Sequence, residues 1–313
     1  MIPLSDEDNV ILAENFNWFA NMAPRPTAIA SLEFPQTGAL HFLSRIDHIA
    51  RNIPSNSFAL APVGIGELPG VTLIEVDSPR AEIARITQSL RINRTADPAR
   101  LAGDANFIAE SAVIGANTTI ASGAVIEAQV EIGENCLIGP GAVIKQRSQI
   151  GDRTIIQSGA VIGEDGYGFA KMDGVWSEPI AHMGGVEIGS NVTIGANAVI
   201  CAGTIDPTLI GEDSKIDGLV YVGHNSNIGR GVMIIAQSVV GGSATIGDHT
   251  WVNPGGLVKT KTTIAKNSVI GMGAVVMRST EVGETVIGNP AGEVRKTMHR
   301  EARLDQLVAS KRK

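Results

Sequence analysis

The most regular feature of the chain is an aliphatic residue, mostly Ile, at every sixth position through its central and C-terminal parts. This repeat runs without a break over residues 108–162, resumes over 188–200, and continues over 210–276 after a slip of four residues. A period of six scatters side chains around an α-helix, whereas short strands joined by tight turns direct every sixth side chain into one core. Three repeats close one triangular coil, so the pattern predicts a parallel β-helix.

The repeat also divides the chain. Residues 1–100 lack it and instead hold apolar runs followed by a helix-like stretch at 79–90, which predicts a small α/β domain. Residues 101–288 are the predicted β-helix domain, including an excursion at 164–187, and residues 289–313 read as a basic C-terminal helix. The predicted fold class is therefore mainly β. The apolar runs of the first domain lie at 38–44, 57–63 and 71–76.

Composition narrows the possible functions. Only 4% of the residues are aromatic and the formal net charge is −7, which argues against extended nucleic-acid binding. Cys136 and Cys201 have no nearby partner in sequence, so we expect two small buried residues in a reducing compartment. No stretch reaches the roughly 18 apolar residues of a membrane span, and the acidic start has no leader pattern. We expect a cytoplasmic protein without a transmembrane segment.

Departures from the repeat are where a regular prism can hold a site. The excursion at 164–187 carries Asp165, Tyr167, Phe169 and His182 among several glycines. Aromatic and polar side chains in a long excursion favour a substrate-binding loop over a plain surface connection.

The second departure surrounds His224, which follows the inward Val222 by two residues and should stand at a corner of a coil. Counting eighteen residues back reaches Asp206, and eighteen forward reaches Gly242. Asp206 would hold one imidazole nitrogen, the other nitrogen would act as a general base, and the Gly242 N–H would stabilise an oxyanion. A non-catalytic β-helix that only binds or scaffolds remains the alternative.

The other histidines form no close ligand pair with His224, and no Cys/His cluster exists, so no metal site is expected. They are His41, His48, His182, His249 and His299.

Four segments together resemble the UDP-3-O-acylglucosamine N-acyltransferase family. They read GEDGYGFA at 163–170, PIAHMGGVEIG at 179–189, KIDGLVYVGHNSNIG at 215–229, and the C-terminal helix. The resemblance implies a left-handed β-helix and transfer of an acyl group from a thioester to the amino group of a nucleotide-linked sugar. It assigns the base to His224, its support to Asp206 and the oxyanion N–H to Gly242.

The family resemblance also implies a homotrimer with active sites between prisms, where the 164–187 loop meets a neighbouring subunit's His224. The co-substrate is an acyl thioester of acyl carrier protein, and no cofactor is bound. In the first domain Phe42 matches the family's uracil-binding segment. Arg45 stands where the family has Asn, and His48 stands near its Tyr, so the nucleotide stays open. Asn225 is a further expected substrate contact.

The donor side departs from the family as well. Lys259 and Lys261 occupy the stretch where a second histidine is often found, and residues 290–313 carry a charge of +4 that includes Arg295. We expect these three residues to bind the donor. The ending ETVIGNPAGEVRK is similar to short-chain acetyltransferases that use coenzyme A, so acyl carrier protein and coenzyme A are both open as donors. The product is accordingly lipid A or, as the alternative, a short-chain acylated surface glycan.

Overall fold

The computed structural model describes residues 2–32, 35–43, 52–94, 99–102 and 106–310. Its contacts divide the chain into two compact units. One comprises Met1–Pro98 together with Asp165–Gly185 and Ala202–Pro207, and the other comprises Ala99–Glu164, Val186–Cys201 and Thr208–Lys313. The repeat predicts that the whole excursion belongs to the β-helix domain, whereas residues 165–185 pack with the N-terminal unit. The reason is the apolar content of the excursion, described below.

The N-terminal unit is built on one five-stranded sheet in the order β1-β2-β3-β4-β5. The three predicted apolar runs form β3, β4 and β5, which are parallel neighbours. Three helices accompany the sheet, and the first begins at a capping box in which Ser5 and Asp8 bond each other's backbone N–H. The bounds are β1(Ile2–Pro3), β2(Ala28–Ile29), β3(Ala39–Phe42), β4(Ser57–Pro62), β5(Val71–Val76), α1(Asp6–Asn15), α2(Asn17–Ala20) and α3(Pro79–Arg94).

The excursion is a β-hairpin rather than an irregular loop. β17(Phe169–Met172) pairs antiparallel with β18(Val175–Pro179). Beyond the hairpin, Ala181 and Met183 join the core of the N-terminal unit, as does Ile205 from the shorter insertion. Burial of these side chains explains why both insertions belong to that unit.

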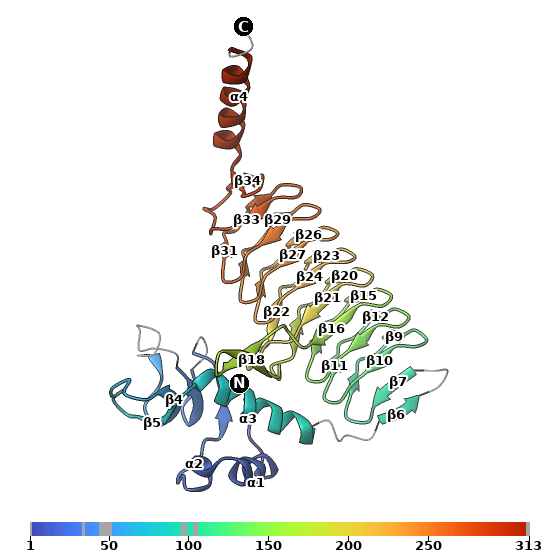
Figure 1. Ribbon diagram of the computed structural model, residues 1–313. Helices are drawn as coiled ribbons and strands as arrows, with labels where there is room; N and C mark the ends of the chain where they lie inside the picture. The colour runs from blue at the N-terminus through green and yellow to red at the C-terminus, as the bar shows by residue number, and fades with distance from the viewer. Residues whose placement is uncertain (1, 33–34, 44–51, 95–98, 103–105, 311–313) are drawn as a thin grey trace. The chain divides into compact units, whose positions relative to one another are not determined.

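The second unit is a β-helix with three faces of short strands, seen stacked coil on coil in Figure 1. The first face holds β6(Ala99–Ala102), β7(Asn106–Ala109), β10(Val125–Ile126), β13(Val143–Ile144), β16(Val161–Glu164), β21(Val199–Cys201), β24(Tyr221–Val222), β27(Val239–Val240), β30(Leu257–Val258) and β33(Val275–Val276). The second holds β8(Val113–Ile114), β11(Glu131–Ile132), β14(Gln149–Ile150), β19(Val186–Ile188), β22(Thr208–Ile210), β25(Asn227–Ile228), β28(Thr245–Ile246) and β31(Thr263–Ile264). The third holds β9(Thr119–Ile120), β12(Leu137–Ile138), β15(Ile155–Ile156), β20(Thr193–Ile194), β23(Lys215–Ile216), β26(Met233–Ile234), β29(Trp251–Val252), β32(Val269–Ile270), β34(Thr285–Ile287) and β35(Gly292–Glu293).

The strand register confirms the predicted coil. Ile126 pairs with Ile144, eighteen residues on, and Val240 pairs with Val258 in the same way. The repeated aliphatic side chains point inward and form one continuous core, in which Ile126 and Ile234 have 0% and 1% of their surface exposed. The six-residue pattern therefore predicted both the coil length and the residues of the core.

Tight corners make this geometry possible. At most corners a residue adopts a positive φ, which Asn tolerates better than most side chains because its amide bonds the local backbone. Asn occupies many of these positions, namely Asn117, Asn135, Asn191, Asn197, Asn225 and Asn267.

The C-terminal helix α4(Val294–Ser310) follows the short strand β35, so the helix begins four residues later than Pro290. The Glu293 carboxylate accepts hydrogen bonds from the backbone N–H groups of Arg295 and Lys296. These bonds cap the helix and lower the pKa of Glu293. The predicted helix is confirmed, and its exposed residues include Met298 and Arg300.

Candidate active site

His224 lies at the corner between β24 and β25, half-buried, as the spacing from Val222 predicted. Its Nδ1 is 3.0 Å from the side-chain oxygen of Asn225. Because an amide oxygen can only accept, Nδ1 carries the proton of this bond and the lone pair is on Nε2. Asn225 is itself held by its backbone N–H, which donates to the Thr208 hydroxyl at 2.8 Å. The imidazole is thus oriented in the tautomer of a general base.

Gly242 stands one coil further on and faces the same imidazole. A Cβ atom added to Gly242 would lie 2.7 Å from His224 Nε2, so no side chain fits there without moving the ring. Among the residues that the structure describes, none accepts a hydrogen bond from the Gly242 N–H. The chain therefore places an imidazole nitrogen against Gly242, whose backbone N–H has the spare hydrogen-bonding capacity that an oxyanion site requires.

Two supporting residues were missed by the sequence analysis. A Cβ atom on Gly223 would lie 2.6 Å from the Gly242 nitrogen, so Gly223 keeps the space next to that N–H open. Thr208 was missed because it is seventeen residues from Asn225, one short of the coil length on which the neighbour count was based. In the sequence, the only indication that Gly223 belongs to the site was its position directly before His224.

Asp206 is buried, with 7% of its surface exposed, and belongs to the N-terminal unit. Its carbonyl is so close to Gly184 and Gly203 that a Cβ on either glycine would overlap it. The Gly184 N–H also donates to the Gly203 carbonyl at 2.8 Å, which joins the two insertions. The role of Asp206 toward His224 stays a prediction.

The residues of the predicted binding loop fall into two groups. Tyr167 and Phe169 have ring centroids 5.0 Å apart, and Tyr167 is 86% exposed. His182 is instead buried, beneath Gly168, where an added Cβ would lie 3.3 Å from the ring. Asp165 is half-buried at the start of the segment. The exposed Tyr167 ring, with the half-buried Phe169 beside it, is available to stack on a ligand, whereas His182 supports the loop from inside.

In the first domain Phe42 ends β3 and is half-buried. Arg45 and His48 lie outside the described residues. Nearby, the buried His41 is 3.3 Å from the Gln36 carbonyl through Nε2, and burial lowers the pKa of its imidazole. His41 is therefore neutral in the folded protein at neutral pH.

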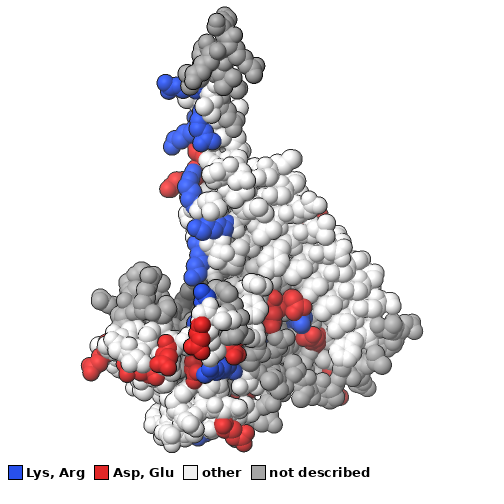
Figure 2. All heavy atoms as spheres, viewed as in Figure 1, with Lys and Arg blue, Asp and Glu red and all other residues white. Residues whose placement is uncertain are grey.

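The predicted donor residues are all exposed. Lys259 and Lys261 flank Thr260, which is one coil beyond Gly242, and the Lys261 N–H donates to the Gly242 carbonyl at 3.0 Å. Figure 2 shows Lys and Arg side chains following one edge of the β-helix and continuing along its C-terminal helix. Arg295 is exposed on that helix.

The structure adds two basic residues to this surface. Lys296 and Arg300 line a cavity of about 320 Å³ together with Arg278 and Glu293. The Arg278 guanidinium is already paired with the Glu284 carboxylate, at 2.5 and 3.1 Å, so its charge is compensated. Lys296 and Arg300 therefore carry the positive charge of this cavity. In the sequence, the only indication of these two residues was the net positive charge of residues 290–313.

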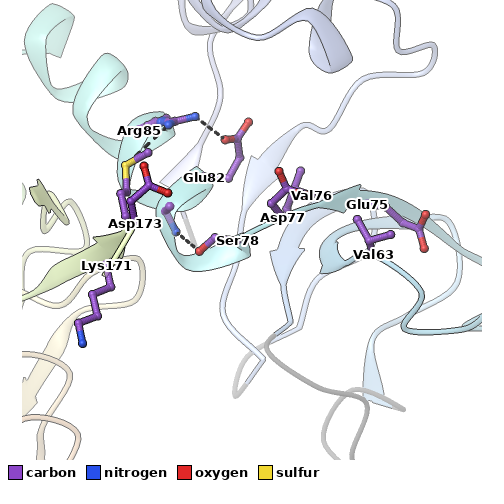
Figure 3. A pocket seen from close by; sticks show the side chains of 11 residues that line it. Val63, Glu75, Val76, Asp77, Ser78, Glu82, Arg85, Lys171 and Asp173 are labelled. Atoms are coloured by element: carbon purple, nitrogen blue, oxygen red, sulfur yellow. Dashed lines mark hydrogen bonds and ion pairs between the residues drawn. The ribbon is translucent and has the colours of Figure 1, made fainter. Parts of the chain in front are cut away.

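A larger cavity of about 520 Å³ lies in the N-terminal unit between the start of α3, the end of β5 and the β17–β18 hairpin. Carboxylates dominate its lining, with Glu75, Asp77 and Asp173 around it, and Figure 3 shows Arg85 directed at Glu82. Such a surface repels phosphate groups. None of the residues predicted from the sequence lines it, and we do not assign it to the substrate.

A third hollow, of about 650 Å³, follows the second face of the β-helix along β8, β11, β14, β19, β22 and β25. Neither His224 nor Gly242 lines any of these three cavities. Within the described ranges no three His, Cys, Asp or Glu side chains are grouped as metal ligands would be. No helix in the described part of the chain is both long and apolar enough to cross a bilayer.

The chain is similar to known proteins both over its repeat and over most of its length. The family of bacterial transferase hexapeptide repeats matches residues 111–146 and 129–164, and the hexapeptide repeat of succinyl-transferase matches residues 185–224. The fold and these family matches thus define a hexapeptide-repeat acyltransferase. The chain is 39% identical over 285 residues to the UDP-3-O-acylglucosamine N-acyltransferase of Delftia acidovorans, covering 89% of this chain and 84% of that protein. The chain belongs to the UDP-3-O-acylglucosamine N-acyltransferase family.

A second relative of the same name, from Albidiferax ferrireducens, is 41% identical over 118 residues, which cover 38% of this chain and 36% of that protein. Among solved structures, LpxA of Bacteroides fragilis, a UDP-N-acetylglucosamine acyltransferase, is similar with a TM-score of 0.56 and 25% identity, covering 62% of this chain and 73% of that one. The UDP-N-acetylglucosamine acyltransferase of Campylobacter jejuni is similar in fold to the same extent, at 24% identity. The β-helix is left-handed, as in this class of acyltransferase.

Proposed function

We propose that this chain transfers an acyl group from a thioester to the amino group of a nucleotide-linked amino sugar, in lipid A synthesis. The observation that carries the proposal is the pair formed by His224 and Gly242. An imidazole held in the tautomer of a base lies against Gly242, whose backbone N–H donates to none of the described residues.

The reaction needs one base and one oxyanion donor. His224 Nε2 removes a proton from the sugar amine as its nitrogen attacks the thioester carbon. The carbonyl oxygen becomes an oxyanion, which the Gly242 N–H stabilises. The C–N bond forms, the C–S bond breaks, and the proton held by His224 passes to the leaving sulfur, so amide and thiol are the products. These steps draw on side chains and backbone alone.

Asp206 supports the imidazolium in this scheme. The support for this assignment is the spacing in the sequence, because Asp206 precedes His224 by eighteen residues, the length of one coil. A buried carboxylate in that position stabilises the positive charge that His224 acquires.

For the acceptor, we propose that Phe42, the exposed Tyr167 and the half-buried Phe169 bind the nucleotide and sugar, together with Asp165. The buried His182 is proposed to support this binding loop from inside, and Asn225 is proposed as a substrate contact beside His224. Aromatic faces stack on a base without requiring a particular one. We also propose that Arg45 takes part in binding the nucleotide. Because Arg45 stands where the family has Asn, more than one nucleotide should be tested.

For the donor, we propose that Lys259 and Lys261 bind the phosphate of the thioester's pantetheine arm, which acyl carrier protein and coenzyme A share. Both lysines are exposed beside the Gly242 coil. Arg295, Lys296 and Arg300 would meet the acidic surface of a carrier protein, because they lie beyond the arm on α4. Both donors are cytoplasmic molecules, so we place the reaction in the cytoplasm.

We further propose a homotrimer, in which neighbouring prisms complete the site. The support is that His224 and Gly242 line none of the three cavities described for a single chain. A groove shared with a second prism would enclose the reacting groups.

The decisive test is a turnover assay of the purified protein with two substrate sets. One set is UDP-3-O-(hydroxyacyl)glucosamine with hydroxyacyl carrier protein, and the other is a panel of nucleotide-linked amino sugars with acetyl coenzyme A. We expect turnover with the first set and a ~10²–10⁴-fold loss in His224→Ala. Turnover only with the second set would favour short-chain acylation of a surface glycan, and normal turnover in His224→Ala would remove His224 from the mechanism.

The matched control is His249→Asn. His249 is an exposed corner histidine of another face and stacks over Gly231 much as His224 faces Gly242. Asn suits its left-handed φ of 56°. This variant should keep wild-type turnover.

The donor proposal is tested by charge removal. Lys259→Gln with Lys261→Asn should raise the KM of either donor, whereas Lys296→Ala with Arg300→Ala should raise only that of the carrier-protein donor. The KM of the sugar should not change, and Lys266→Gln at an exposed corner of the second face is the control. Equal effects on donor and sugar would count against donor binding by these residues.

A further inference from the structure

Cys201 and Tyr221 form a hydrogen-bonded pair on the first face of the β-helix. The Cys201 thiol donates to the Tyr221 hydroxyl oxygen at 3.2 Å. Tyr221 begins β24, three residues before His224, and Cys201 ends β21 one coil earlier. Cys201 is buried, with 1% of its surface exposed, so the pair joins the interior to the outer surface beside the catalytic corner.

Tyr221 interrupts a row of aliphatic side chains. On each strand of the first face the residue before the inward aliphatic residue points outward, and the strand register aligns these residues from coil to coil. Every other member of the row from β10 to β33 is Val or Leu, and nearly all are half-buried. They are Val125, Val143, Val161, Val199, Val239, Leu257 and Val275.

The Tyr221 hydroxyl can donate one hydrogen bond in addition to the one that its oxygen accepts. The phenol oxygen accepts from Cys201, so the proton of the Tyr221 hydroxyl points to another acceptor. In the described part of the chain no residue accepts it. Burial raises the pKa of Tyr221 above its usual range, so the hydroxyl stays protonated and remains a donor at any physiological pH.

We propose that the Tyr221 hydroxyl donates a hydrogen bond to an oxygen atom on the acyl chain of a substrate, and that Cys201 positions it. This inference rests on the proposed acyl transfer, which brings an acyl carbon to His224. An aliphatic row is the surface on which the remainder of such a chain can lie. Three strand residues span at most about 10 Å, so the phenol can reach only the first carbons of the chain.

Two oxygens fit this description. One is a hydroxyl near the thioester of the donor, and the other is an oxygen on the acyl group already attached to the acceptor sugar. Both are hydrogen-bond acceptors on an acyl chain, so one assay with two arms separates them.

The experiment compares wild type with Tyr221→Phe, which removes only the hydroxyl. The first arm measures kcat/KM for a hydroxyacyl donor and for the same donor without its hydroxyl. The second arm makes the same comparison for acceptors that differ in the hydroxyl of the O3-linked chain. We expect wild type to prefer the oxygen-bearing member of one pair by about 3- to 10-fold, and Tyr221→Phe to abolish that preference alone.

Cys201 is tested as a positioning residue. Cys201→Ser retains a donor to the phenol and should keep the preference, whereas Cys201→Ala should reduce it with little change in kcat for the deoxy substrates. Val239→Ala, in the same row one coil on, is the control and should lower both members of each pair equally.

Transfer with wild-type preferences in Tyr221→Phe would overturn this inference alone. The same holds if wild type shows no preference in either arm. No transfer with any pair would overturn the proposed function and this inference with it.

Discussion

His224 and Gly242 depend on each other for space, because the imidazole occupies the volume that a side chain at position 242 would need. The φ of Gly242 lies outside the left-handed region, so the backbone itself accepts alanine there. Glycine is needed at this position for the ring and not for the turn.

We therefore predict that Gly242→Ala keeps the fold and loses activity. The added Cβ displaces the imidazole from its place beside the 242 N–H, which should lower kcat by ~10²–10³-fold with little change in melting temperature. Thr260→Ala, one coil further in the same column, is the control for the kinetic assay. A Gly242→Ala enzyme with wild-type kcat would show that the ring does not work from this position.

His41 gives the N-terminal unit a pH dependence. Burial lowers the pKa of its imidazole below the ordinary value of 6.5, so the folded protein binds its proton less readily than the unfolded chain does. The contribution of neutral His41 to the free energy of unfolding is complete above pH 6.5. As the pH falls below that value, this contribution is lost by at most about 1.4 kcal/mol per pH unit. We predict that the melting temperature falls more between pH 7.5 and 5.5 in wild type than in His41→Gln. An equal fall in both proteins would contradict this assignment.

At the scale of elements, each strand of the β-helix presents one residue to the core and its neighbour to the surface. In β26, Ile234 is 1% exposed and Met233 is 41% exposed. We predict that Ile234→Ala lowers the free energy of unfolding by about 2–4 kcal/mol, whereas Met233→Ala lowers it by less than about 1 kcal/mol. Denaturant unfolding of both variants measures the difference, and similar losses would contradict the inward register.

The two insertions show how much of the site organisation the repeat predicts. Each breaks the six-residue period, so the sequence analysis located both. It did not show that they pair, through the bond from the Met183 N–H to the Thr204 carbonyl and the bridge of Gly185 with Gly203. These contacts join residues in two segments that both lack the six-residue pattern, and burial of Met183 and Ile205 in the N-terminal core brings the segments together.

At the scale of the whole molecule, the proposed trimer predicts a mass in solution of three times the 32.7 kDa chain. It also predicts complementation, because the 164–187 loop of one subunit is proposed to serve His224 of another. Mixed trimers of His224→Ala and a loop variant, Tyr167→Ala with Phe169→Ala, should regain activity that each variant lacks. A monomeric mass, or mixed trimers without gain, would contradict the shared site.

The sequence alone determined the β-helix, its coil length, its core and the corner at which His224 stands. A periodic pattern can do this because each inward position is buried by its counterparts one coil away, so local spacing and tertiary contact coincide. The neighbour Gly242 followed from the same count, whereas Lys259 and Lys261 were predicted from the family resemblance. The tertiary structure alone decided what lies off the period. The Asn225–Thr208 support of His224, the membership of the insertions in the N-terminal unit, and the Cys201–Tyr221 pair depend on side-chain contacts that no spacing encodes.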